Sequence, residues 1–438
     1  MLKLYTGLEQ RSVTKVSQCR VTFVTAPNRE MIDNGEKSEA MPSPQTDNAN
    51  PIEDDNEPIQ VVFARGENET KQSIFAKLNP RLPLVALAIV ALLAAMWGGL
   101  LRVGWQFPPI IQILPAVHGP LMIVGFLGTL ISLERAVAMQ ARWAYLAPIL
   151  STLGTLILFL NSDSHVGIFI ATLGSIALLM IFVVIVNRHL ALYTGTMAFG
   201  IVIWVLGNLI WLADIPVYRI VNWWAVFLIL TIVGERLELS RIQRLSQRTL
   251  VLYSIAIGIF LVGLVVDFAE VQFDTATVFG ARLVGLGMLA IALWLARFDI
   301  ARRTVRQQGL TRFIAICLLA GYFWLGVSGV LRIYYGGATG GFAYDAILHT
   351  VFLGFVISMI FGHAPIIFPS VLGRPINYRP SFYVHLILLH VSLVLRVIGD
   401  LVLTMPWRQW GAMLNVIAVL LFLFATVSSI AQSARATR

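Results

Sequence analysis

The chain has 438 residues, of which 58% are hydrophobic and only 13% are charged. A soluble domain carries about 25% charged residues, so this composition excludes an ordinary soluble protein. The net charge of +9 comes from basic residues in the short segments between apolar runs, so it indicates the loops of a membrane protein and not a nucleic-acid-binding surface. The two cysteines do not indicate a disulfide framework, because Cys19 lies in a polar segment and Cys317 inside an apolar one, and the sequence has no covalent haem-attachment or iron–sulfur spacing.

The first 81 residues form a polar segment. Residues 28–58 are rich in Asp, Glu, Asn, Ser and Pro and have few aromatic side chains. Such a segment cannot bury enough apolar surface to offset the entropy lost on ordering. We therefore predict a disordered cytoplasmic tail over residues 1–81 and a transmembrane domain over residues 82–438.

From residue 83 onward, apolar runs of about 20 residues alternate with short polar breaks, and each run is long enough to cross a bilayer as a helix. The sequence predicts an all-α membrane protein with twelve spans. Their expected ranges are 83–103, 111–133, 144–161, 166–187, 190–212, 217–238, 249–267, 276–297, 311–334, 345–369, 381–403 and 409–432. The fourth and fifth spans are the least distinct, because almost no loop separates them.

The basic residues predict the orientation of these spans. Short loops rich in Lys and Arg stay in the cytoplasm. The loops after the even-numbered spans carry most of the arginines, with the largest groups at 236–248 and 297–312, whereas the alternate loops carry few. Both termini are therefore predicted to be cytoplasmic, in a multi-pass protein of the bacterial inner membrane.

Five of the seven histidines lie within spans, where an ionisable side chain indicates a functional site. His118 lies about seven residues into the second span, and His349 about four into the tenth. Because both spans run inward, the two imidazoles lie at a similar depth, in the outer third of the membrane. Two imidazoles at one depth on two helices can ligate one haem iron axially. The alternative for each histidine is an interhelical hydrogen bond.

Other ionisable residues in the spans suggest two further features. Near the outer ends of four spans lie Arg102, Arg219, Arg332 and Arg396. These cations are candidate partners for haem propionates; alternatively they reach toward lipid head groups or pair with Asp214, Asp345 and Asp400. His363 lies about 21 Å below His349 along the helix, so with His385 and His390 it suggests a second, inner metal site.

A weak internal repeat relates spans that are four apart. The second span ends in Leu133-Glu134-Arg135 and the sixth in Gly234-Glu235-Arg236, at the same membrane face, and Gly362-His363 in the tenth span is a candidate third copy. The pattern is consistent with three four-helix units. The alternative is that each Glu-Arg pair is a solvated or interfacial ion pair at a helix end.

Two segments resemble the NnrS family of polytopic membrane proteins. In the tenth span the resemblance is carried by Leu348-His349, Gly354, Met359, Ile360 and the later Gly373-Arg374-Pro375; in the second span it is carried by His118, Met122, Gly125 and Phe126. Members of that family hold haem and copper and are associated with the response to nitric oxide. The resemblance therefore implies haem and copper as cofactors and nitric oxide or another diatomic ligand as a partner.

The opening His118-Gly119 is also similar to the second helix of the haem–copper oxidase superfamily, in which histidines on helices two and ten hold the low-spin haem. That resemblance implies a haem role for His118 and His349 and an arrangement like that of the oxidase subunit I. Oxidase and nitric oxide reductase chemistry also needs a metal held by histidines on helices six and seven. Residues 217–238 and 249–267 contain no histidine, cysteine or methionine, so neither activity is expected.

The sequence thus favours a haem protein of the membrane that acts in nitric oxide response or protection, redox sensing or electron transfer, with an unknown redox partner. A secondary transporter without a metal is the main alternative, because twelve spans, repeats and prolines within spans are typical of transporters. A non-catalytic assembly protein is the third.

Overall fold

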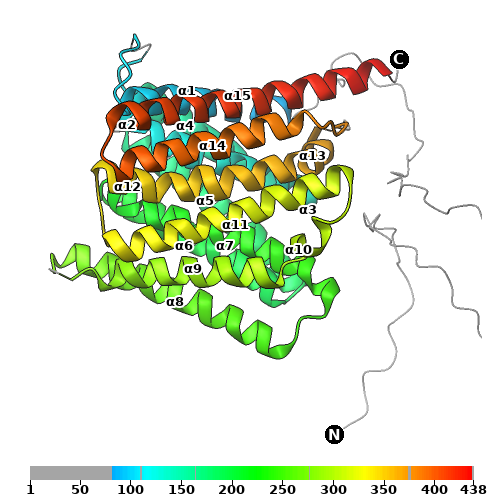
Figure 1. Ribbon diagram of the computed structural model, residues 1–438, viewed down its shortest axis with the longest axis horizontal. Helices are drawn as coiled ribbons and strands as arrows, with labels where there is room; N and C mark the ends of the chain where they lie inside the picture. Colours follow the sequence, from blue (N-terminus) through cyan, green and yellow to red (C-terminus); the bar gives the residue numbers. More distant parts are fainter. Residues whose placement is uncertain (1–80, 109–110, 163, 276, 373–375, 437–438) are drawn as a thin grey trace, which may run out of the picture. The chain divides into compact units, whose positions relative to one another are not determined.

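The computed structural model describes residues 81–108, 111–162, 164–275, 277–372 and 376–436 (Figure 1). The predicted tail, apart from Arg81, and the Gly373-Arg374-Pro375 segment lie outside these ranges. Arg81 donates from Nε to the Tyr145 hydroxyl at 3.1 Å and from Nη1 to the Val371 carbonyl at 3.0 Å, so it packs against the transmembrane domain. The described part of the chain contains helices and loops and no strand.

All twelve predicted spans are confirmed as helices long and apolar enough to cross a membrane, and the protein is a multi-pass membrane protein. Nine spans consist of a single long helix: α1 (Leu82–Arg102), α5 (His165–Arg188), α6 (Leu192–Leu212), α7 (Val217–Ser240), α8 (Gln247–Gln272), α9 (Phe279–Phe298), α11 (Gly309–Tyr335), α14 (Phe382–Leu401) and α15 (Met405–Ala436). The third span joins a short 3-10 turn, η3 (Arg142–Tyr145), to α4 (Leu146–Leu160), and two short helical turns, η4 (Arg241–Gln243) and α10 (Ala301–Thr304), lie in loops.

The second and tenth spans each contain a π-helical segment. The second consists of α2 (Leu114–Pro120), η2 (Leu121–Gly128) and α3 (Thr129–Met139), and the tenth of α12 (Gly341–His349), η5 (Thr350–Ile357) and α13 (Ser358–Leu372). Segments η2 and η5 are the π-helical ones. π-helical turns are rare and occur often at functional sites, and these two directly follow the segments that carry His118 and His349.

The helix boundaries follow from local chemistry. The fourth and fifth spans are separate, because the helix stops at Arg188 and starts again at Leu192. Ser164 and Ser246 cap α5 and α8, each accepting a hydrogen bond from a backbone N–H of the first turn at 3.3 Å. These caps satisfy donors that the helix leaves unpaired.

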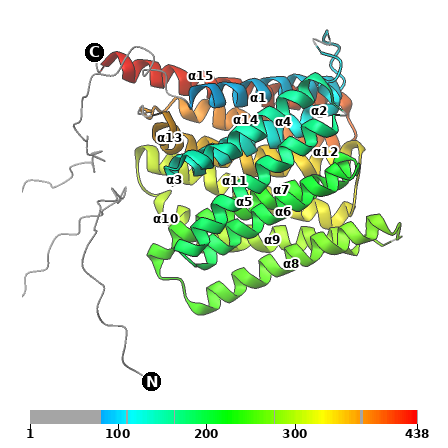
Figure 2. The ribbon, with the colours of Figure 1, turned by 180° about the vertical axis from the view of Figure 1, so that it is seen from behind.

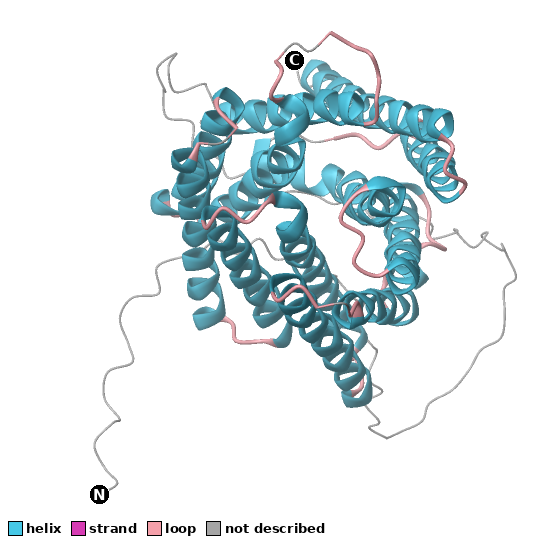
Figure 3. Ribbon diagram, turned by 90° about the vertical axis from the view of Figure 1, so that its left-hand side faces the viewer, coloured by secondary structure: helices cyan, strands magenta, loops and turns pink. Residues whose placement is uncertain are grey.

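The second, sixth and tenth spans are the most buried of the twelve, which lie side by side in one bundle (Figures 1–3). In the most apolar window of these spans 67%, 72% and 67% of the residues are buried, against 33% to 56% in the other nine. The three also contact one another pairwise, through α2 and α7, α3 and α13, and α7 and η5. We therefore call them the central spans.

The Glu-Arg pairs at the ends of the second and sixth spans differ in their surroundings. Arg135 forms ion pairs with Glu134 and with Glu235, which joins the two spans, and these three side chains are partly exposed. Arg236 is 3% exposed and donates from Nε and Nη2 to Asp299 at 2.9 and 3.0 Å. Arg236 is therefore a buried partner of the residue that follows α9, and it is not solvated.

Candidate functional site

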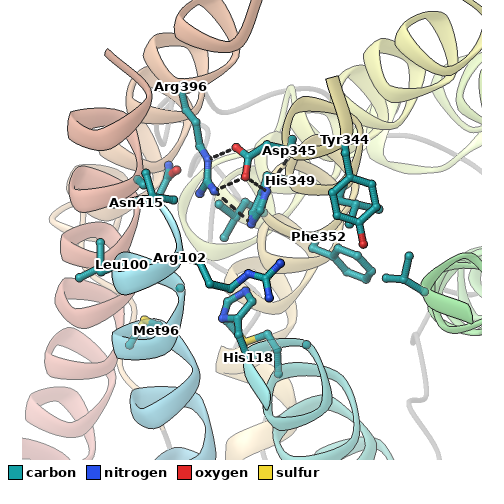
Figure 4. Close-up of a pocket in the computed structure, with 18 of the residues that line it drawn as sticks. Met96, Leu100, Arg102, His118, Tyr344, Asp345, His349, Phe352, Arg396 and Asn415 are labelled. Carbon is teal, nitrogen blue, oxygen red and sulfur yellow. Dashed lines mark hydrogen bonds and ion pairs between the residues drawn. The ribbon is translucent and has the colours of Figure 1, made fainter. Parts of the chain in front are cut away.

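A cavity of about 660 Å³ opens among the central spans, at the end of the bundle where α1 ends and α2 begins (Figure 4). This is the end predicted to face the periplasm. Met96, Leu100, Met122 and Phe352 contribute apolar walls, and the lining also includes the polar and charged residues Arg102, Tyr344, Asp345, Arg396, Arg408 and Asn415. Cavities of 300–1,000 Å³ with apolar walls and a few placed polar groups are typical of cofactor sites.

His118 and His349 face each other in this cavity. Their ring centroids are 6.5 Å apart and their planes differ by 31°. The sequence predicted a shared depth for the two rings, and the structure also places them on facing sides of their helices. A metal–imidazole bond is about 2 Å long, so two imidazoles on opposite sides of one metal ion have centroids roughly 6 Å apart.

Both histidines are oriented by a backbone carbonyl. Nδ1 of His118 lies 2.6 Å from the carbonyl oxygen of Ala95, and Nδ1 of His349 lies 2.9 Å from that of Asp345. Because a carbonyl only accepts hydrogen bonds, Nδ1 carries the proton in each ring. Nε2 is then the unprotonated nitrogen, which is the state needed in a metal ligand.

Gly99 makes room for the ring of His118. A Cβ at this position would lie 2.9 Å from Cε1 and 3.1 Å from Nδ1 of the imidazole. Because real side chains do not approach so closely, only glycine allows the ring to lie against α1 with its Nδ1 on the Ala95 carbonyl. The close packing of α1 against α2 therefore fixes the position of one candidate ligand.

Asp345 connects His349 to two arginines. Its carboxylate accepts hydrogen bonds from Nε and Nη2 of Arg396 at 2.7 and 2.9 Å, and it forms an ion pair with Arg408, whose Nη2 lies 3.2 Å away. It also lies 3.3 Å from Nδ1 of His349. Arg408 in turn contacts Asp400 at 3.2 Å. The two carboxylates and two guanidinium groups thus form one network beside the histidine pair.

The four predicted outer-end arginines separate into two groups. Arg102 and Arg396 line the cavity, and Nη1 of Arg102 donates to the Pro115 carbonyl at 3.0 Å. Arg332 instead donates to Asp267 and to Asn222, at 2.9 and 3.0 Å. Arg219 lies over the ring of Tyr218, and neither Arg219 nor Arg332 lines the cavity.

Arg408 and Tyr344 line the cavity and were missed by the sequence analysis. Arg408 was overlooked because the twelfth span was expected to begin at residue 409, whereas α15 begins at Met405. Tyr344 lies four residues before Leu348, which also lines the cavity, so its place on the same helix face as Leu348 was a usable signal.

The three inner histidines do not gather into one site. His385 is 2% exposed and lies among aromatic rings, with the Phe361 centroid 4.8 Å away. His390 accepts a hydrogen bond from Trp324 Nε1 at 2.9 Å, and Nδ1 of His363 bonds to the Met359 carbonyl at 2.7 Å. Within the described ranges, no group of three or more His, Cys, Asp or Glu side chains is placed to hold a metal ion.

The fold and the cavity define a class: a multi-pass helical membrane protein with a histidine pair between its central spans. The chain matches the family described as Domain of unknown function (DUF8744) over residues 81–431, and it belongs to that family. A comparison with curated proteins finds no match.

Proposed function

We propose that the protein is a membrane haem protein in which His118 and His349 are the two axial ligands of one iron. The observation that carries the proposal is the 6.5 Å separation of their ring centroids inside a cavity of about 660 Å³. Donor type and the spacing of the ring centroids fit two ligands of one iron. The Nδ1 bonds to carbonyls leave Nε2 as the metal-binding nitrogen of each ring.

The charged side of the cavity fits the carboxylates of a haem. Arg102, Arg396 and Arg408 lie on the cavity wall, and guanidinium groups bind carboxylates through paired hydrogen bonds. One contact has to change on binding, because Nη2 of Arg396 lies 3.3 Å from Nε2 of His349. Arg396 retains its Nε bond to Asp345 when that nitrogen moves aside.

Two axial histidines favour electron transfer or redox sensing over catalysis at the iron. A haem with both axial positions filled supplies one-electron chemistry and leaves no position for a substrate. The chain's own contribution is to hold both imidazoles in one tautomer and to place buried positive charge nearby. The resemblance to the NnrS family adds a physiological setting, the response to nitric oxide, and adds copper as a metal to measure alongside iron.

The arrangement of the central spans supports a three-unit repeat like that of haem–copper oxidase subunit I. Spans two, six and ten are four apart in the chain, are the most buried, and contact one another pairwise. The Arg135–Glu235 pair joins corresponding positions of the first two units. A rotational repeat explains why one histidine of the pair lies on the second span and the other on the tenth.

An absorption spectrum of protein purified from haem-replete cells tests the proposal. We expect a Soret band and a low-spin, six-coordinate spectrum, both lost in His118→Ala and in His349→Ala. His363→Ala is the matched control, because His363 has the same Nδ1-to-carbonyl bond but lies outside the cavity. Colourless wild-type protein, or a spectrum that survives both substitutions, would contradict the proposal.

A secondary transporter is the second candidate, and the π-helical segments in the second and tenth spans favour it. Transporters bind substrate near the membrane centre at irregular helices, and both η2 and η5 contribute to the cavity lining, through Met122 and Phe352 among others. This function predicts a substrate that stabilises colourless protein against heat. It also predicts that the histidine substitutions change transport without changing any absorption band.

A further inference from the structure

A second cavity, of about 620 Å³, opens on the membrane-facing side at the opposite end of the bundle. It lies between α6, α7 and α8 and is lined by Leu190, Ala191, Leu192, Gly195, Thr196, Phe199, Leu230, Ile257 and Leu261. We call it the α6–α8 groove. Helix α8 lies at the edge of the bundle (Figures 1 and 2), and its residues Ile257 and Leu261 form one wall of the groove.

The walls of the α6–α8 groove offer no free polar group. Thr196 is its one polar side chain, and its hydroxyl donates to the Leu192 carbonyl at 2.8 Å and accepts from the Tyr253 hydroxyl at 3.1 Å. Every other side chain in the lining is apolar. The groove therefore suits a hydrocarbon chain, and it suits a polar substrate poorly.

The groove extends from the start of α6 into the membrane-spanning part of the bundle. Its wall on α6 runs from Leu192 to Phe199, about 10 Å along the helix, and its wall on α8 reaches Leu261, fourteen residues or about 21 Å from Gln247. One leaflet of the hydrocarbon core is about 15 Å thick. The depth of the groove is therefore comparable to that of one acyl chain of a lipid whose head group lies at the predicted cytoplasmic surface.

The mouth of the groove is positively charged. The loops at 187–191 and 238–248 carry four arginines and a single acid, Glu238; the arginines are Arg188, Arg241, Arg244 and Arg248, all exposed. Nη1 of Arg241 donates to the Tyr193 hydroxyl at 3.1 Å, and its guanidinium lies 5.6 Å from the centre of that ring. Tyr193 stands between groove residues on α6, so one cation is held beside the mouth.

We propose that the α6–α8 groove is a binding site for an anionic phospholipid, with an acyl chain in the groove and the phosphate at these arginines. Basic groups beside clefts between transmembrane helices on the cytoplasmic side are typical sites for anionic lipid head groups. The site is separate from the histidine pair and does not depend on haem. Its occupant bridges α6 and α8, which the Tyr253–Thr196 hydrogen bond already joins within the membrane.

The test is a thermal unfolding assay of the full-length protein in mild detergent, titrated with phosphatidylglycerol or with phosphatidylcholine of the same chains. A lipid that binds the folded state raises the midpoint in proportion to its affinity. We expect phosphatidylglycerol to raise it more than phosphatidylcholine does, and glycerol phosphate, which lacks acyl chains, to have no effect. Equal shifts from the two lipids would overturn the proposal.

Two pairs of variants locate the site. Gly195→Leu fills the groove, whereas Gly258→Leu places the same side chain on α8 outside it; a Cβ at either position meets no atom within 4 Å, so both variants are expected to fold. Phosphatidylglycerol stabilisation should be lost in the first and kept in the second.

The second pair of variants tests the charge at the mouth of the groove. Arg241→Gln/Arg244→Gln removes two of its arginines, and Arg302→Gln/Arg303→Gln removes two arginines from α10, which packs on α9 and α11, as the control. Losing two basic contacts should weaken the apparent affinity for phosphatidylglycerol roughly thirtyfold, and the α10 substitutions should leave it unchanged. Native mass spectrometry of the same proteins should show one retained anionic lipid fewer in Gly195→Leu. Equal lipid retention and equal midpoint shifts in all four variants would place the lipid elsewhere and refute the site.

Discussion

At the scale of single residues, depth in the membrane was predictable and direction around the helix axis was not. His118 and His349 were paired because each position could be counted from the end of its span. Arg396 and Arg332 also lie near the outer ends of spans, yet one turns toward the cavity and the other toward Asp267. The direction in which a side chain points around the helix axis cannot be predicted for such a span. Its residues are apolar on every side, so the sequence has no polar face that would indicate which side is turned toward the bundle.

The same limit explains why the importance of Asp345 emerges only from the structure. The sequence offered it as a counter-ion for one of several arginines, but its carboxylate receives hydrogen bonds or ion pairs from both Arg396 and Arg408. Both arginines approach from helices that follow it by at least 37 residues in the chain. Contacts of this range depend on how helices pack, which local sequence does not encode.

Replacement of Asp345 with Asn should destabilise the protein by about 3 kcal/mol, because breaking a buried ion pair leaves its partners charged and uncompensated. The side chains of Asp345 and Arg396 are only 8% and 6% exposed, so water cannot substitute for the carboxylate. Thermal unfolding in detergent measures the change. Asp214→Asn is the control, since its pair with His165 is 76% and 64% exposed and should contribute less than 1 kcal/mol. Equal midpoints for the two variants would contradict this role for Asp345.

Substitution of Gly99 by Ala should reduce haem binding about tenfold, the lower range of effects seen when a group that orients a metal ligand is lost. The added methyl would lie 2.9 Å from Cε1 of His118 and would push the ring from the Ala95 carbonyl. The measurement is haem content per protein at matched haem supply. At Gly326 a Cβ meets its nearest neighbour at 3.6 Å, so Gly326→Ala should bind haem normally. An unchanged haem content in Gly99→Ala would show that the ring has room to move.

At the scale of elements, hydropathy was sufficient to find every span and the chain breaks between them, because each helix must present about 20 apolar residues to lipid. It could not reveal the π-helical segments η2 and η5, since the composition of a π-helical turn does not differ from that of the α-helix around it. These segments matter for the site, because an altered turn changes which residues below it face the bundle centre.

A buried ion pair at the predicted cytoplasmic end should contribute strongly to the stability of the contact between α7 and α9. Arg236 on α7 and Asp299 after α9 are 3% and 0% exposed at their side chains, and Asp299 also accepts from the Ala301 backbone N–H at 2.7 Å. Arg236→Met should cost about 3–5 kcal/mol, because it leaves a buried carboxylate without a cation. The double variant Arg236→Met/Asp299→Asn should cost less than the sum of the two single changes. Additive losses in thermal unfolding would show that the two side chains act independently.

At the scale of the whole molecule, ionised side chains pair with one another at both ends of the bundle. Two groups lie near the predicted outer end, Asp345 with Arg396 and Arg408, and Asp267 with Arg332; two pairs lie at the other end, Arg135–Glu235 and Arg236–Asp299. Between them the central spans are packed with apolar side chains. Charges placed toward the ends avoid the free-energy cost of ionised groups at the bilayer centre. The ion pairs also join helices that are distant in the chain and that no short loop connects.

The orientation of this assembly is the remaining prediction at that scale. Because the arginine-rich loops stay in the cytoplasm, the histidine cavity should open toward the periplasm and the mouth of the α6–α8 groove toward the cytoplasm. Gln106 and Gln307 are exposed in loops at opposite ends, so single cysteines can be placed there in a background of Cys19→Ser and Cys317→Ala. In intact cells a membrane-impermeant thiol reagent should label Gln106→Cys and spare Gln307→Cys, while inside-out vesicles should give the reverse. Labelling of Gln307→Cys in intact cells would show that the orientation is the reverse of the predicted one, with the histidine pair near the cytoplasm.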